Sequence, residues 1–126
     1  MKNHIAVGVG ALLILFATVA VRANPDEATQ TVFKKLMSAT ISNNYDAFVA
    51  ECDAKMKAAL TKPMLEGVSK QLEARVKQGY DALYLGELKQ QGYAVHLWRL
   101  RFKDGGDDIL ATLSLKDGKV GGFFLH

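Results

Sequence analysis

The chain has 126 residues, of which 49% are hydrophobic and 23% are charged, with a formal net charge of +3 at pH 7. These values are typical of one ordinary globular domain, and they exclude a disordered chain and a multidomain protein. The charge excess is too small for a typical nucleic-acid binder, and a single cysteine excludes an internal disulfide framework.

Residues 1–23 have the pattern of a secretory signal peptide. A positive end with Lys2 precedes an uncharged apolar stretch, residues 5–21. Small residues predict cleavage after Ala23, with Ala20 as the alternative. An uncleaved membrane anchor is the other interpretation, although this stretch would span only about 25 Å of a hydrocarbon core about 30 Å thick. We expect an extracytoplasmic protein, periplasmic or secreted, whose mature domain begins at residue 24 with a net charge of +1.

The first half of residues 24–126 has helical apolar spacing. Residues 24–27 combine a capping amide at Asn24, a proline and two acids, so we expect a helix to begin there and to end at residues 42–44. Residues 45–60 predict two short helices, and residues 61–63 begin a further helix that ends at Gly79. The expected inner faces contain Ala28, Val32, Phe33 and Leu36, then Phe48, Cys52, Met56 and Leu60, and finally Leu65, Val68, Leu72 and Val76.

The second half alternates between apolar and polar residues. This pattern predicts four strands, at 82–89, 93–103, 108–116 and 119–125. Gln91-Gly92 and Asp117-Gly118 are two-residue turn signals, and residues 104–107 form a longer turn. The strands should therefore form an antiparallel meander. Helices followed by such a sheet predict an α+β fold in a single domain, residues 24–126.

The turns also predict the register of the strands, which pairs Lys89 with Tyr93, Lys103 with Asp108 and Lys116 with Lys119. In this register one face of the sheet is almost entirely apolar, and a shift of one residue would mix charged side chains into it. We therefore expect this face to pack on the helices. It would contain Tyr84, His96, Trp98, Leu100, Phe102, Ile109, Ala111, Leu113, Leu115, Val120 and Phe124.

Three segments carry a resemblance to a known family. Residues 45–48 (Tyr-Asp-Ala-Phe), residues 52–60 and the ending at residues 117–124 are similar to the bacterial DUF3887 family, whose function is unknown. The resemblance covers most of residues 24–126. It implies the cystatin-like cone of the NTF2-like superfamily, in which helices cover the concave side of a curved sheet, and it implies no catalytic residues.

Motifs for catalysis and metal binding are absent. The sequence has no serine-hydrolase elbow, no phosphate-binding glycine loop with lysine and no zinc-protease motif, so it predicts neither a metal nor a cofactor. Asp104, Asp107 and Asp108 do not form a calcium loop, because Leu115 stands where the bidentate glutamate belongs. Cys52 lies on an apolar helix face, which favours a buried side chain over a nucleophile or an intermolecular disulfide.

His96 is the polar residue on the expected inner face. The predicted register places it opposite Gly86, next to Tyr84 and Trp98, and the glycine leaves room for a cavity. An apolar wall with few polar groups is typical of a ligand site, so we predict Tyr84, His96 and Trp98 as ligand-binding residues. The alternative is a core histidine that is hydrogen-bonded within the protein.

The other face of the sheet is expected to expose an apolar patch. A patch of this size usually meets another surface, so we predict a homodimer interface there. The alternative is that the C-terminal tail or the first helix covers part of it. The predicted interface residues are Leu85, Leu97, Leu110 and Phe123.

These observations favour a noncatalytic extracytoplasmic module that binds a small apolar molecule or a protein partner. They predict no nucleic-acid partner, and a membrane contact only through an uncleaved leader. The alternative function is an isomerase- or dehydratase-like enzyme with a pocket around His96 and Tyr84. Such an enzyme also needs an acid, and Asp81 and Glu87 fall on the opposite face of the predicted sheet.

Overall fold

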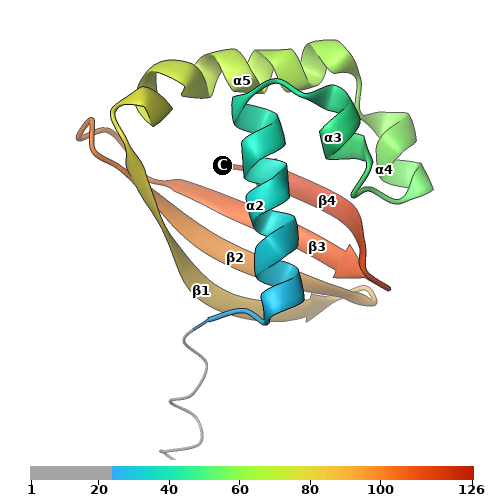
Figure 1. Ribbon diagram of the computed structural model, residues 1–126. Coiled ribbons are helices and arrows are strands. Elements are labelled where there is room, and N and C mark those ends of the chain that lie inside the picture. The colour runs from blue at the N-terminus through green and yellow to red at the C-terminus, as the bar shows by residue number, and fades with distance from the viewer. Residues whose placement is uncertain (1–23) are drawn as a thin grey trace, which may run out of the picture.

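The computed structural model describes residues 24–126, so the predicted signal peptide and its cleavage after Ala23 lie outside the described residues. The helices are α2 (Glu27–Ile41), α3 (Tyr45–Val49), α4 (Ala54–Ala59) and α5 (Lys62–Lys77). An antiparallel sheet of order β1-β2-β3-β4 follows, with β1 (Tyr80–Gln90), β2 (Tyr93–Phe102), β3 (Ile109–Lys116) and β4 (Lys119–Leu125). Figure 1 shows the helices on one side of a curved sheet, with α2 lying across it. The predicted α+β class and the antiparallel meander are confirmed.

A polar side chain caps the start of each helix. At α2, Oδ1 of Asp26 accepts a hydrogen bond from the main-chain N–H of Thr29 at 2.7 Å. Asn44, Asp53 and Thr61 have the same role at α3, α4 and α5. The two predicted short helices within residues 45–60 are confirmed. The expected cap at Asn24 is wrong, because the helix begins two residues later, where the Asp26 carboxylate meets the positive end of the helix dipole.

The core lies between α2 and the inner face of the sheet. The Phe33 ring stacks on Trp98 with the ring centroids 3.9 Å apart and the planes 8° from parallel. Trp98 is 1% exposed, and Leu100, Ala111 and Leu113 are also buried, as predicted for this face. The pairing of β2 with β3 differs from the prediction by two residues, with Leu100 opposite Ile109. A shift of two residues leaves every side chain on its own face, so the predicted faces of β2 and β3 hold.

A β-bulge in β1 overturns the predicted register there. Tyr84 pairs with Trp98 as predicted, but Leu85 is an extra residue, and Gly86 pairs with Leu97. Gly86 has φ +140°, a backbone conformation that glycine adopts far more readily than other residues. Beyond the bulge the predicted pairs are therefore wrong by one residue. Glu87, and not Gly86, lies opposite His96.

A second bulge, at Gly121 in β4, reverses the faces of the last residues. Val120 pairs with Leu115 and Phe123 pairs with Leu113, so Gly121 is the additional residue. Phe123 is 9% exposed on the inner face, whereas Phe124 is 56% exposed on the outer face. The prediction that Phe124 points inward and Phe123 points outward is wrong, because the extra residue shifts the alternation of side chains by one. Phe123 is therefore not part of the outer face.

The segment between α3 and α4 runs along the free edge of β4. Cys52 forms an isolated parallel bridge with Val120. The main-chain N–H of Val120 donates to the Glu51 carbonyl oxygen, and the N–H of Asp53 donates to the Val120 carbonyl oxygen, each at 2.9 Å. These bonds fix the short helices against the sheet.

Candidate functional site

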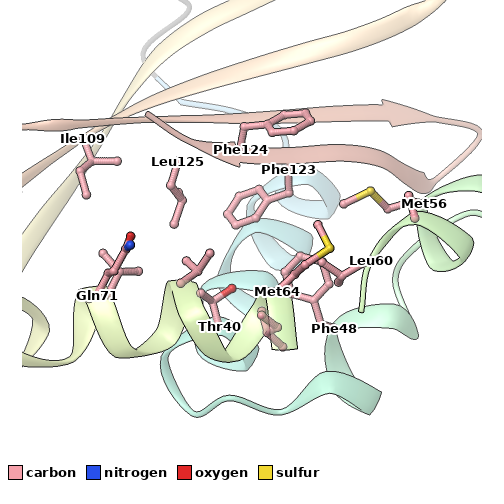
Figure 2. A pocket seen from close by; sticks show the side chains of 14 residues that line it. Thr40, Phe48, Met56, Leu60, Met64, Gln71, Ile109, Phe123, Phe124 and Leu125 are labelled. Carbon is pink, nitrogen blue, oxygen red and sulfur yellow. The ribbon is translucent and has the colours of Figure 1, made fainter. Parts of the chain in front are cut away.

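An apolar cavity of about 380 Å³ lies between α5, the short helices and β4. Figure 2 shows side chains from both the helices and the sheet around it. Its walls contain no Lys, Arg, His, Asp or Glu, and its volume is in the range of small-molecule sites. The lining residues are Thr40, Phe48, Met56, Ala59, Leu60, Met64, Leu65, Val68, Gln71, Leu72, Ile109, Phe123, Phe124 and Leu125.

Two features of the sequence build this cavity. The bulge at Gly121 turns Phe123 inward, where its ring centroid lies 6.0 Å from that of Phe48 on α3. The break between α3 and α4 lets the chain turn, so that Met56 on α4 reaches the same space. Figure 2 shows the Phe123 side chain at the cavity on β4 and the Met56 side chain on α4. The cavity thus depends on both the bulge and the interrupted helix.

Two polar side chains, Thr40 and Gln71, interrupt the apolar lining. Thr40 lies on α2 and is 1% exposed, and its hydroxyl donates a hydrogen bond of 2.7 Å to the Leu36 carbonyl oxygen. The hydroxyl proton is therefore engaged, and the oxygen keeps acceptor capacity. Gln71 lies on α5, and Figure 2 shows its amide pointing toward the sheet near Ile109. The wall offers hydrogen-bonding groups without charge.

The structure brings the predicted residues Tyr84, His96 and Trp98 together, but away from this cavity. The Tyr84 hydroxyl oxygen lies 2.9 Å from Nδ1 of His96, and the Tyr84 ring meets the edge of Trp98 with centroids 5.4 Å apart. His96 is 4% exposed. Tyr84 also lines a surface depression with Gly86, Glu87 and Lys89, and His96 is not among its lining residues. This arrangement agrees with the alternative of a packed histidine, and a ligand-binding role for the three residues stays a prediction.

Glu87 is the acid that sequence reasoning placed on the wrong face. It lies directly opposite His96 in the β1–β2 pairing, because the bulge at Leu85 shifts the alternation of β1. The signal was present in the sequence, since an isolated glycine within a strand, here Gly86, often marks a bulge. The residues of the apolar cavity gave no comparable signal, because they come from separate helices and strands.

The other candidate residues have structural roles in the described part of the chain. Cys52 is buried, its thiol donates to the Phe48 carbonyl oxygen at 3.4 Å, and burial raises its pKa to about 11. Asp104 binds Arg75 and Asp108 binds Arg99, each with an N–O distance of 2.7 Å. Within residues 24–126 no group of three or more possible metal ligands is present.

No helix within residues 24–126 is long and apolar enough to cross a membrane.

Comparisons with known proteins give one structural similarity. The chain is similar to an uncharacterized cystatin-fold protein from Novosphingobium aromaticivorans, with 15% sequence identity and a TM-score of 0.42. The alignment covers 76% of this chain and 95% of that protein. No family model and no curated protein matches the chain. Membership of the DUF3887 family, suggested by residues 45–48, 52–60 and 117–124, therefore stays a prediction.

Proposed function

We propose that this protein is a noncatalytic module that binds a small apolar molecule in the cavity between α5 and β4. The observation that carries the proposal is the apolar lining of this open cavity of about 380 Å³, in which no ionisable side chain takes part. Binding of an apolar molecule in a cavity with such walls lowers the free energy, because it removes apolar surface from water. Met56 and Met64 add flexible side chains that adapt to ligands of different shape.

The predicted leader supports binding outside the cytoplasm, and we propose a periplasmic or secreted carrier or sensor of such molecules. The three residues of the earlier ligand-site prediction, Tyr84, His96 and Trp98, are not needed for this function, because none of them lines the apolar cavity.

The alternative function, an enzyme centred on His96, has less support. A general base must come within hydrogen-bond reach of the proton that it removes. His96 is buried, and Nδ1 is already engaged with Tyr84. The structure therefore favours binding over proton transfer.

Binding of the neutral dye N-phenyl-1-naphthylamine tests the proposal. Its fluorescence should rise on titration with the protein and saturate at one dye per chain. Ala59 lines the cavity and is exposed, so Ala59→Phe fills the space without displacing a buried side chain. We expect this variant to weaken dye binding at least about tenfold, which corresponds to about 1.4 kcal/mol.

The matched control is Ala58→Phe, since Ala58 is the neighbouring exposed alanine on α4 and is not part of the lining. Leu85→Glu is a second control, because it changes the exposed outer face of the sheet and should leave dye binding intact. Absence of dye binding, or equal binding by the Ala59 and Ala58 variants, would overturn the proposed function.

A further inference from the structure

We propose that the cavity selects neutral molecules that carry one hydroxyl group, and that Thr40 and Gln71 bind this group. The inference rests on the proposed function and adds the chemical class of the ligand. It follows from the charges and hydrogen-bonding groups around the cavity.

The first step is the exclusion of charged ligands. No ionisable side chain lines the cavity. Moving an ionised carboxylate or amine from water into such a site without a partner has a large desolvation cost. Two lysines of α5 are paired with glutamates one helical turn earlier, Lys70 with Glu66 at 3.5 Å and Lys77 with Glu73 at 3.4 Å. The Lys62 ammonium group lies over the Tyr45 ring, 5.8 Å from its centroid. None of these cations is in the lining.

The second step concerns the two polar groups that are in the lining. The Thr40 hydroxyl donates to the Leu36 carbonyl oxygen, so toward the cavity it acts as an acceptor. The Gln71 amide provides both an N–H donor and a carbonyl acceptor. A ligand hydroxyl has one donor and two acceptor lone pairs, so it matches this pair. An ether oxygen has no proton to donate to Thr40, and a hydrocarbon satisfies neither group.

The third step concerns the position of the polar groups. Thr40 and Gln71 come from α2 and α5, whereas Phe48, Met56 and Leu60 come from α3, α4 and the residue that follows α4. Figure 2 shows Gln71 on the side of Ile109, far from Met56. The same view places Thr40 between Gln71 and Met64, so the polar groups lie on the Gln71 side and in the middle, and Met56 lies on the other side. A molecule with a single hydroxyl would direct its apolar body toward Met56.

Displacement of N-phenyl-1-naphthylamine by 1-octanol, octanoate and octyl methyl ether tests this selectivity. 1-Octanol and the ether share an octyl chain and differ in the head group, and octanoate has eight carbons including its carboxylate. We expect 1-octanol to displace the dye at concentrations at least about tenfold lower than octanoate. The advantage over the ether should be about fivefold, the effect of one hydrogen bond.

Two variants separate the head-group contacts from the shape of the cavity. Thr40→Val keeps the volume and removes the acceptor, and Gln71→Leu removes the amide from an exposed position of α5 where folding is not at risk. Both should lose the preference for 1-octanol over the ether when displacement is measured relative to each variant's own affinity for the dye. Gln71→Lys should bring octanoate closer to 1-octanol.

The outcomes distinguish the two proposals. Equal displacement by all three probes, or a preference for 1-octanol that survives in both variants, overturns the selectivity and leaves the binding function intact. Displacement of the dye by octanoate at the same concentrations as 1-octanol also overturns the selectivity and leaves the binding function intact. Failure of the dye to bind overturns the binding function, and the selectivity with it.

Discussion

The hydroxyl group of Tyr84 and Nδ1 of His96 are joined by a 2.9 Å hydrogen bond across the β1–β2 pair. Tyr84→Phe removes this bond and leaves a nitrogen of a nearly buried imidazole without that partner. An unsatisfied buried polar group costs about 1–3 kcal/mol, so we expect the free energy of unfolding in urea to fall by this amount. Tyr93→Phe, at a tyrosine outside this pair, is the control. Unchanged stability of the Tyr84 variant would show that the bond contributes nothing.

Cys52 should be unreactive in the folded protein. Its thiol is buried and its pKa is raised to about 11, chiefly by desolvation and then by the negative charge of Asp53. At pH 8 only about one thiol in a thousand would be ionised, and the thiolate is the reactive form. We expect 5,5′-dithiobis(2-nitrobenzoate) to label one thiol per chain in denaturant and almost none in buffer. Rapid labelling in buffer would contradict the burial of Cys52.

The hydrogen bonds to Asp104 make stability depend on pH. Its carboxylate accepts from Arg75 at 2.7 and 3.3 Å and from the Gly106 main-chain N–H at 2.8 Å. The Arg75 hydrogen bond, followed by the Gly106 bond, lowers the pKa of Asp104 below its usual value. A lowered pKa in the folded state stabilises the protein above the unfolded value of about 3.9. This stabilisation is lost as the pH falls through the folded value.

We therefore expect the melting temperature of the parent protein to fall on acidification below about pH 4. Asp104→Asn should lower the melting temperature at pH 7 and show a smaller further loss in acid. Asp107→Asn is the control, because the main-chain carbonyl oxygen of Asp107 accepts from Arg75 and survives this change. Parallel pH profiles for the parent and the Asp104 variant would refute the assignment.

Replacement by alanine should change the stability of the protein in opposite directions at two glycines that have open space around them. A Cβ at Gly86 or at Gly67 would meet no atom within 4 Å, but only Gly86 has a positive φ, of +140°. Gly86→Ala should therefore destabilise the protein by about 1–3 kcal/mol through backbone strain. Gly67→Ala lies within α5 and should stabilise it by about 0.5–1 kcal/mol. Chemical denaturation measures both, and equal effects would contradict the bulge.

The outer face of the sheet predicts self-association. Its exposed apolar residues are Leu83, Leu85, Leu88, Leu110 and Phe124. The charges beside them are paired within the chain, Arg99 with Asp108 at 2.7 Å and Arg101 with Asp81 at 3.7 Å, so two identical faces would not repel each other. This neutrality is why we propose a second copy of the chain as the partner.

Light scattering should give the mass of a dimer for the parent protein and of a monomer for Leu85→Glu. Met64→Glu is the matched control, because Met64 is similarly exposed but lies on α5. A monomeric parent, or a Leu85 variant that remains dimeric, would reject this interface.

Sequence periodicity predicted the helices and strands well, but it predicted the side-chain faces of the two edge strands, β1 and β4, poorly. The faces of β2 and β3 followed from their unbroken alternation, and Trp98 and Leu113 are buried as expected. The errors lie in β1 beyond Leu85 and in β4 beyond Gly121, where one extra residue moves every later side chain to the other face. Strict alternation of side chains cannot show where such an extra residue is inserted. Gly86 in β1 and the consecutive Gly121 and Gly122 in β4 were the available warning.

The apolar cavity was beyond prediction for a different reason. Phe48, Gln71 and Phe123 are separated by long stretches of sequence, and their meeting depends on how the helices pack on the sheet. Periodicity reports which side of an element is apolar, but not whether two apolar sides fill the space between them. The hollow predicted beside His96 stays a prediction, and only its assumed neighbour changes, because Glu87 and not Gly86 lies opposite His96.

The main-chain bonds that tie Glu51 and Asp53 to Val120 also bear on how copies of the chain avoid joining strand to strand. An edge strand with unpaired N–H and carbonyl groups is a template for fibrous aggregation. At the start of β4 these groups are occupied by the protein's own loop, so an incoming strand finds no partner there. Loosening of this loop would therefore expose unpaired main-chain groups of β4 as a template for aggregation.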